Sequence, residues 1–261
     1  MRPLVLIGID GLRPEALGRA HCLTLTGLRE RGASTLRASS VMPSVSLPCW
    51  MSVFHGVPPS RHGVITNDWM PMADPLPGLV ELASAAGLRC GSLFNWGPIR
   101  DVTRPSSLAF SCFRNNLDDH RNGDQEIADQ AAQYFLADHP DFMFVYLGVL
   151  DEVAHVVRFM SDEYLRQVER VDATVGTLIH ALPPDATILV VSDHGGHDHS
   201  HGDDVPEDMT VPWIIAGPGI RRHHEIEARV SIIDTAPTAA RVLGLTPPPG
   251  WEGRAVDEVF V

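Results

Sequence analysis

The chain has 261 residues, of which 44% are hydrophobic and 20% charged, and its formal net charge is -13. This composition is typical of a globular protein with one large core, alone or with a small subdomain. The acidic balance argues against binding to a nucleic-acid backbone or an anionic membrane surface, because both need clustered Lys and Arg. The four cysteines are widely spaced without a C-x-x-C pair, so neither a disulfide framework nor a zinc knuckle is expected.

In chain order, short apolar runs alternate with stretches of helical spacing. The first run, residues 3–10, predicts a buried strand that ends in an acid, and it is too short for a signal peptide. Further strands are expected at 141–151, 186–195 and 211–219, with weaker candidates at 89–95 and 108–113. Helices are expected at 78–87, 124–139, 161–182 and 234–244, with Ser161 as the N-cap of the longest.

This alternation predicts an α/β fold in which a mostly parallel central sheet lies between two layers of helices. In such folds ligands bind beyond the carboxyl ends of the strands. No segment approaches the length of a membrane span, so we expect a soluble, cytoplasmic protein.

Acidic residues and histidines follow three of the predicted strands. Asp10, Asp151 and Asp193 end these strands, His194 is adjacent to Asp193, and His155 lies four residues after Asp151. If a helical turn begins there, Asp151 and His155 share one face. A mixture of Asp and His suits zinc or manganese better than calcium, which prefers oxygen ligands alone. A His-rich loop can also be merely solvated and polar, so the ligand interpretation depends on the rest of the chain.

A second candidate element surrounds Ser46. The segment VMPSVSLPCWMSVFHG places Ser46 and Pro48 in the first turn of a predicted helix. A helix N-terminus stabilises an anion and lowers the cost of ionising a hydroxyl group, which suits a nucleophile. Serine is also a common N-cap, and the segment by itself favours that ordinary role.

Taken together, these motifs resemble the alkaline phosphatase superfamily, in particular its nucleotide pyrophosphatase/phosphodiesterase-like and phosphonoacetate-hydrolase-like branches. The resemblance covers nearly the whole chain, in order. It is carried by LVLIGIDGLRP, MPSVSLPCWMSVFHGVPPSRHGVITND, LDEVAH, SDHGG, SHGDDVPEDMTVPWIIAGPGI and IIDTAPTAARVLGLTPPPGWEG.

The resemblance implies two divalent metal ions, zinc or manganese, and a serine nucleophile. One ion would be bound by Asp151, His155 and His201. The other would be bound by Asp10, Asp193 and His194, with the Ser46 oxygen facing it. Two cations roughly 3.5–4 Å apart can clamp a phosphoryl group between nucleophile and leaving group. His201 is preferred to His197 and His199 because it begins a His-Gly pair, which leaves the other two in the solvated loop or behind the ligands.

The sequence departs from its relatives at three points. Relatives of the phosphodiesterase branch have an Asn as oxyanion donor a few residues after the nucleophile, where this chain has Cys49. Orientation of the phosphate would then depend on the Leu47 N–H, on Asn67 or on another group. The segment also lacks the arginine of the C/S-x-P-x-R motif, which argues against a sulfatase. No large cap domain is evident, so we expect residues 1–261 to form a single catalytic domain.

The resemblance implies a metal-dependent hydrolase of phosphate mono- or diesters, or of phosphonates, that forms a phosphoseryl intermediate. Two alternatives remain open: a phosphotransferase or mutase of the same superfamily, and a metal-binding relative without turnover. The expected partner is a small-molecule phosphoester or phosphonate, with neither nucleic acid nor membrane involved. The sequence does not identify the substrate, the native metal or the oligomeric state.

Overall fold

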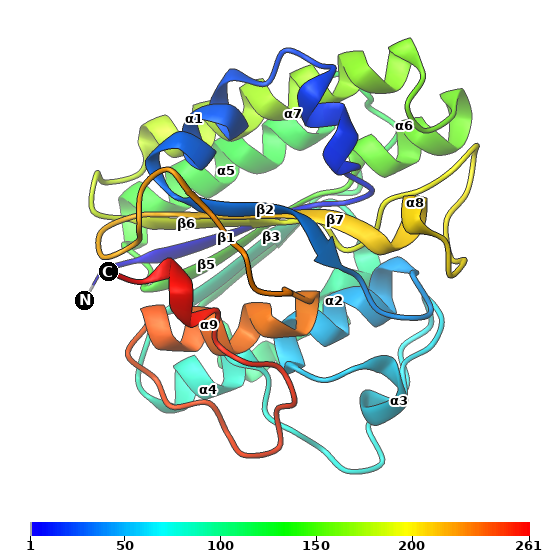
Figure 1. Ribbon diagram of the computed structural model, residues 1–261. Helices are drawn as coiled ribbons and strands as arrows, with labels where there is room; N and C mark the ends of the chain where they lie inside the picture. Colours follow the sequence, from blue (N-terminus) through cyan, green and yellow to red (C-terminus); the bar gives the residue numbers. More distant parts are fainter. Residues whose placement is uncertain (1) are drawn as a thin grey trace.

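The computed structural model describes residues 2–261 and contains an eight-stranded sheet between two layers of helices (Figure 1). The strands are β1 Leu4–Ile9, β2 Ala33–Ser39, β3 Cys90–Phe94, β4 Phe110–Phe113, β5 Phe142–Leu147, β6 Thr187–Val191, β7 Thr210–Ala216 and β8 His224–Glu225. Their order in the sheet is β4-β3-β5-β1-β6-β7-β2-β8. Among the described strands only β7 runs antiparallel to its neighbours, so the predicted mostly parallel α/β fold is confirmed.

The helices cover both faces of this sheet. One layer holds α1 Leu23–Arg31, α5 Gly123–Asp138, α6 Val149–Val157 and α7 Asp162–Ala181. The other holds α2 Ser46–His55, α3 Pro59–His62, α4 Leu79–Ala85 and α9 Thr235–Val242 (Figure 1). A short helix, α8 Pro206–Met209, precedes β7, and 3₁₀ turns lie at Pro14–Gly18, Gly97–Asp101, Pro105–Ser107, Ile232–Asp234 and Asp257–Val259. The four expected helices appear as α4, α5, α7 and α9, and Ser161 caps α7 through the Tyr164 N–H as predicted.

The core explains why the central strands are apolar throughout. In β1 the side chains of Leu4 and Leu6 pack into the layer of α2, α4 and α9. Those of Val5, Ile7 and Ile9 pack into the layer of α1, α5 and α7. Both faces of the strand are thus buried, which is the environment that continuous apolar runs indicate. None of the helices in residues 2–261 is both long enough and apolar enough to cross a bilayer.

The structure differs from the sequence-based expectation in several elements, among them α1, which was not predicted, and two that concern the sheet. The strand expected at 141–151 ends at Leu147, and Asp151 lies in α6 instead. Strand β2 was not predicted, because its small and polar residues, ASTLRAS, form no apolar run. It nevertheless pairs with β7 and extends the sheet beyond the predicted strands.

Candidate metal and nucleophile site

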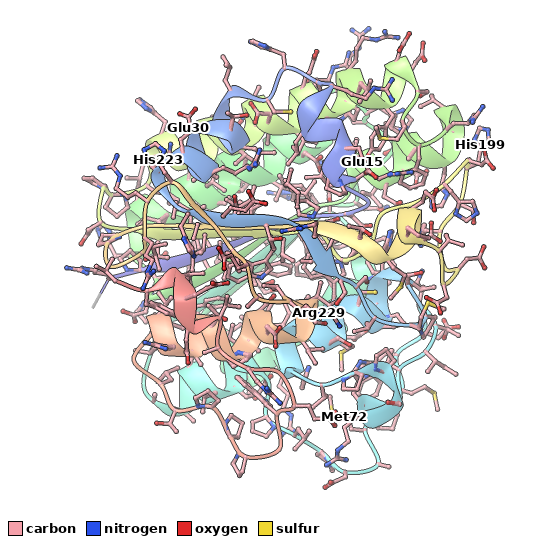
Figure 2. All side chains as sticks on the ribbon, in the orientation of Figure 1. Glu15, Glu30, Met72, His199, His223 and Arg229 are labelled. Atoms are coloured by element: carbon pink, nitrogen blue, oxygen red, sulfur yellow. The ribbon has the colours of Figure 1, made fainter. Side chains whose placement is uncertain are left out.

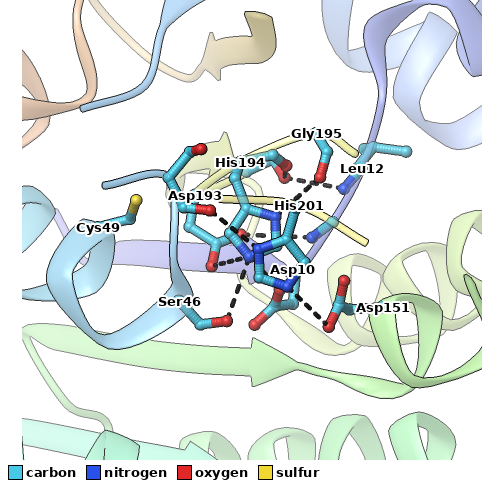
Figure 3. Close-up of polar contacts among 12 residues, drawn as sticks. Asp10, Leu12, Ser46, Cys49, Asp151, Asp193, His194, Gly195 and His201 are labelled. Atoms are coloured by element: carbon cyan, nitrogen blue, oxygen red, sulfur yellow. Dashed lines mark hydrogen bonds and ion pairs between the residues drawn. The ribbon is translucent and has the colours of Figure 1, made fainter. Parts of the chain in front are cut away.

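The carboxyl ends of β1 and β6 bring three predicted ligands together. The strands are parallel neighbours, with Gly8 opposite Val191, so Asp10 and Asp193 emerge side by side. The Nε2 atom of His194 lies 3.3 Å from Oδ1 of Asp10 and 3.4 Å from Oδ2 of Asp193. All three side chains are almost completely buried, with exposures of 0–2%. We call Asp10, Asp193 and His194 the inner site (Figure 3).

The backbone beyond these strands is fixed by hydrogen bonds between the two loops. The Gly11 N–H donates to Oδ1 of Asp193 at 3.3 Å, and the Leu12 N–H donates to Oγ of Ser192 at 2.9 Å. Gly11 has a φ of +67°, and a Cβ at this position would lie 2.8 Å from Oδ1 of Asp151. Glycine is therefore required there both by the left-handed backbone and by the close approach of a candidate ligand.

We call the remaining predicted ligands, Asp151, His155 and His201, the outer site, although the compact group of metal-type side chains there is Asp151, His194 and His201, with His155 beside Asp151 only. Asp151 and His155 lie one helical turn apart on α6, and Oδ2 of Asp151 is 3.1 Å from Nε2 of His155. The Nε2 atom of His201, from the loop after β6, is 3.8 Å from the same oxygen. The His201 ring stacks on that of His194 with centroids 3.7 Å apart, so the inner and outer sites are in contact.

All three candidate histidine ligands point the same nitrogen into the site. The Nδ1 atom of His155 contacts the His199 carbonyl at 2.7 Å, that of His194 contacts the Gly195 carbonyl at 2.8 Å, and that of His201 contacts the Ser44 carbonyl at 2.9 Å. A carbonyl oxygen accepts only, so Nδ1 must carry the proton in each ring. When a ring is neutral, its unprotonated nitrogen is then Nε2, on the side of the carboxylates, which is the arrangement that metal-binding histidines require.

The buried carboxylates of the inner site, together with Asp151, carry negative charge that a cation would compensate. Oδ1 of Asp10, Oδ1 of Asp151 and Oδ2 of Asp193 are buried and lack a hydrogen-bond partner within residues 2–261. Burial, followed by repulsion from Asp193 and Asp151, raises the pKa of Asp10 well above its ordinary value. Burial likewise raises the pKa of Asp193 to about 6. Buried carboxylate oxygens without a donor are costly unless a positive ion compensates them, so the residues present fit divalent metal binding.

Electrostatics differ in the outer site. Although burial raises the pKa of Asp151, the hydrogen bond from His155 and the charges of nearby histidines outweigh it, so the pKa is lowered overall. The same hydrogen bond raises the pKa of His155 to about 9. Without a metal, Asp151 and His155 can therefore form an ion pair that neutralises this part of the cluster.

Ser46 lies next to the inner site and is not a helix cap. The N-cap of α2 is Val45, and Ser46 is the first helical residue. Its Oγ lies 3.2 Å from Nε2 of His194 and makes no capping hydrogen bond (Figure 3). The ordinary N-cap role that the segment alone favours is thus wrong. The hydroxyl is buried and stands at the N-terminus of a helix, where an anion is stabilised.

The Cys49 side chain does not face the candidate phosphate position. It is fully buried, and its sulfur contacts Oγ of Ser40 at 3.3 Å and the carbonyls of Val41 and Pro43. Asn67, in contrast, accepts a 3.0 Å hydrogen bond from the Leu47 N–H through its amide oxygen. This bond ties the Asn67 side chain to the residue that follows Ser46 and leaves its NH₂ group as the available donor.

Three residues that the sequence did not identify as ligands make specific contacts around the site. His199 was expected in the solvated loop or behind the ligands; it is exposed, and its Nδ1 contacts the His155 carbonyl at 3.1 Å while its own carbonyl contacts Nδ1 of His155. His199 lies at the rim of the molecule (Figure 2). His197 contacts Asp208 at 2.7 Å and, with Asp203, forms a separate group of metal-type side chains. Tyr146, not singled out by any motif, donates a hydrogen bond to Oδ2 of Asp10.

This fold, with its cluster of Asp and His at the carboxyl edge of the sheet, is the one predicted from the resemblance to the alkaline phosphatase superfamily. Within it, residues 4–210 match the family described as type I phosphodiesterase / nucleotide pyrophosphatase, and the chain belongs to that family.

Individual relatives are distant. An uncharacterised pyrophosphatase/phosphodiesterase of Schizosaccharomyces pombe is 24% identical over an alignment 219 residues long that covers 74% of this chain and 44% of the relative. The chain thus spans less than half the length of this relative. Murine ectonucleotide pyrophosphatase/phosphodiesterase 5, in an inactive form with AMP, superposes with a TM-score of 0.83 at 16% identity, covering 100% of both chains. A phosphonate monoester hydrolase of Silicibacter pomeroyi gives 0.74 at 19% identity, covering 100% of this chain and 76% of its own. At these identities the solved structures establish a common fold.

Proposed function

We propose that the protein is a two-metal hydrolase of phosphate esters or phosphonates in which Ser46 is the nucleophile. The observation that carries this proposal is the common orientation of His155, His194 and His201, whose Nε2 atoms face three buried carboxylates. The inner site would bind one ion and the outer site the other. His194 has a single unprotonated nitrogen and can ligate one ion only, so His155 is needed to complete the outer set.

The chain's own residues have separate tasks in this reaction. Bound divalent ions supply positive charge that favours the Ser46 alkoxide and neutralises the phosphoryl and leaving-group oxygens. Ser46 attacks phosphorus from the N-terminus of α2, whose dipole also favours its ionised oxygen. The Ser46–P bond forms as the bond to the leaving oxygen breaks, and that oxygen takes up a proton. Water then hydrolyses the phosphoseryl ester, which releases phosphate from a monoester, a phosphate monoester from a diester and a phosphonate from a phosphonate ester.

Asn67 has a proposed role in substrate binding. Its amide oxygen is occupied by the Leu47 N–H, so its NH₂ group can donate to a non-bridging phosphoryl oxygen beside Ser46. This assignment places the oxyanion donor on the loop after α3. The buried Cys49 thiol takes no part in it.

The substrate class follows from the same site. Two cations and an amide donor suit the phosphoryl group of a small-molecule phosphoester or phosphonate. Zinc is the proposed metal, with manganese as the second candidate, because the ligands combine imidazole with carboxylate. Aryl monoester, aryl diester, phosphonate and sulfate ester substrates, each tested with zinc and with manganese, would identify the preferred reaction. Phosphate release without an added alcohol acceptor would separate a hydrolase from a mutase.

The decisive variant is Ser46→Ala. We expect turnover of the best ester to be abolished and the metal content to stay close to that of the wild type, because the substitution removes the attacking oxygen and leaves the Asp and His ligands in place. Activity assays and elemental analysis of the purified variant measure the two quantities.

The matched control is Ser52→Ala, which removes a hydroxyl from the same helix; that hydroxyl contacts His62, not a candidate ligand. The control should keep both metal and turnover. A Ser46→Ala protein that still hydrolyses the ester within a few-fold of the wild type, free of contaminating phosphatase, would refute the mechanism.

A further inference from the structure

Tyr146 is the last but one residue of β5 and reaches across to the inner site from the neighbouring strand. Strands β1 and β5 are parallel, with Gly8 opposite Tyr146 and Ile9 opposite Leu147. Because side chains alternate along a strand, Asp10, Gly8 and Tyr146 lie on one face of the sheet. The phenol of Tyr146 is 2% exposed and donates its hydrogen bond to Oδ2 of Asp10.

The ring of Tyr146 is fixed by aromatic neighbours on two sides. Trp50 of α2 meets it edge-on with centroids 5.6 Å apart, and Trp96 stacks on it at 6.2 Å. A Cβ on Gly8 would lie 2.3 Å from the Trp50 ring, so the absence of a side chain there lets Trp50 approach the sheet. The phenol therefore has little freedom to leave Asp10, and the hydrogen bond is a built feature of the core.

This hydrogen bond makes the two oxygens of the Asp10 carboxylate unequal. Oδ2 is occupied by the phenol, whereas Oδ1 is buried without a hydrogen-bond partner and lies 3.3 Å from Nε2 of His194. Oδ1 is therefore the oxygen that is free of a hydrogen bond and available to an ion. A carboxylate whose second oxygen accepts a hydrogen bond binds less readily through both oxygens, which is a common mode for ions that take six or more oxygen ligands.

We propose that Tyr146 is a positioning residue that restricts Asp10 to a one-oxygen ligand, and that it thereby favours a four-coordinate ion such as zinc over manganese at the inner site. The inference rests on the proposed function, in which Asp10 ligates the inner ion. It adds a determinant of metal preference that lies outside the ligand set. Zinc sites are commonly tetrahedral, whereas manganese favours octahedral oxygen-rich coordination.

The test compares Tyr146→Phe with the control Tyr134→Phe. Both variants remove one oxygen atom from a buried ring, but the Tyr134 hydroxyl has no partner among residues 2–261 and lies outside the site. Metal-free protein of each variant is titrated with zinc and with manganese against a chromophoric chelator. Thermal unfolding of the metal-free proteins shows whether the fold is retained, and Co²⁺ absorption reports coordination number, because tetrahedral Co²⁺ absorbs more strongly than octahedral Co²⁺.

We expect Tyr146→Phe to lower zinc affinity by roughly 10–100-fold, the usual effect of losing a hydrogen bond to a metal ligand. Manganese affinity should change much less, so the zinc-to-manganese ratio falls at least tenfold and the Co²⁺ bands weaken. Tyr134→Phe should match the wild type in all three measurements.

The possible failures are distinguishable. A wild-type protein that binds neither ion would refute the proposed function itself. Wild-type binding with an unchanged ratio in Tyr146→Phe, or an equal loss for both ions, would overturn the role of Tyr146 and leave the proposed function standing. If Tyr146→Phe fails to fold without metal, Co²⁺ spectra of the variant purified in the presence of Co²⁺ decide the matter: bands identical to those of the wild type overturn the proposal.

Discussion

The inner and outer sites are built from the same residue types but on different supports. Asp10, Asp193 and His194 follow two paired strands at the centre of the sheet and are 0–2% exposed. In the outer site, Asp151, His155 and His201 come from a helix and a loop, with exposures of 14%, 39% and 9%. A central strand is hydrogen-bonded to its neighbours along its whole length, which fixes the residues at its end. The outer site depends instead on local contacts between α6 and the loop after β6.

The two sites also differ in how their charge is balanced. Burial raises the pKa of both inner aspartates, and within residues 2–261 no Lys or Arg side chain forms an ion pair with either of them. The outer Asp151 has His155 as a partner that can take the positive charge. The inner site therefore depends more on a cation than the outer one does. Ligand chemistry alone, which is nearly the same in both, would not reveal this difference.

The largest expected effect tests the outer site through His201→Ala. Losing this ligand leaves the outer ion with Asp151 and His155 alone, and an ion contributes several kcal/mol to transition-state stabilisation, so turnover should fall by about 1,000-fold. Steady-state kinetics at saturating zinc measure the loss.

His197→Ala is the control, since His197 contacts Asp208 and faces neither site, and we expect turnover within a few-fold of the wild type. His199→Ala should lie between the two, because its ring holds the backbone of His155. Equal losses in all three variants would mean that His201 is not the ligand.

The next largest effect concerns removal of the ions. A chelator should remove the exposed outer ion first with little change in thermal stability, and the buried inner ion later with a large one. An ion present at about 100 times its dissociation constant stabilises the folded state by about 2.7 kcal/mol, and repulsion between Asp10 and Asp193 adds to the loss. Elemental analysis and thermal unfolding along one chelator titration follow both steps. Loss of both ions without a change in melting temperature would contradict the electrostatic difference between the sites.

Much of this arrangement could be predicted from the sequence, because it rests on local signals. Continuous apolar runs predicted β1, β5 and β6, and the residues that follow those runs supplied the candidate ligands. Strand β2 was missed because pairing with β7, not hydrophobicity, makes it a strand. Tyr146 was missed because an aromatic residue inside FMFVYL carries no sign of which neighbour it contacts. That residues 1–261 form a single domain without a large cap stays a prediction.

Cys49 and Asn67, the two residues considered in connection with an oxyanion donor, show what sequence spacing cannot predict. Proximity in sequence suggested that Cys49 stands where relatives have a donor, yet its thiol is turned into the core. Asn67 is 20 residues beyond Leu47 and reaches it through a loop whose path no periodicity describes. Contacts that close through a loop depend on tertiary packing, so a sequence pattern alone does not fix them.

The smallest expected effect concerns Asp124, which supports the helix of the outer site. Oδ1 of Asp124 accepts hydrogen bonds from Asn95 and from the Val149 N–H at the start of α6, whereas its buried Oδ2 has no partner among the described residues. Burial raises the pKa of Asp124 to about 6. The folded state therefore binds more protons than the unfolded state between about pH 4 and 6, and this residue makes the wild type less stable as the pH rises through that window.

Asp124→Asn keeps an acceptor for both donors and removes the charge. The free energy of unfolding of the variant, relative to the wild type, should rise between pH 4 and 6 and reach a plateau about 1–2 kcal/mol higher above pH 7. Urea unfolding of both metal-free proteins at several pH values measures this difference, and titration of the metal ligands cancels because both proteins share it. Asp119→Asn is the control, since hydrogen bonds from Asn122 and Arg121 lower the pKa of Asp119; its pH dependence then lies below about pH 4, and the variant should show no rise between pH 4 and 6. A difference between Asp124→Asn and wild type that stays constant from pH 4 to 8 would show that Asp124 is ionised throughout. The start of α6 would then be held by a buried charge, and the outer site would share the electrostatic cost that we assign to the inner site.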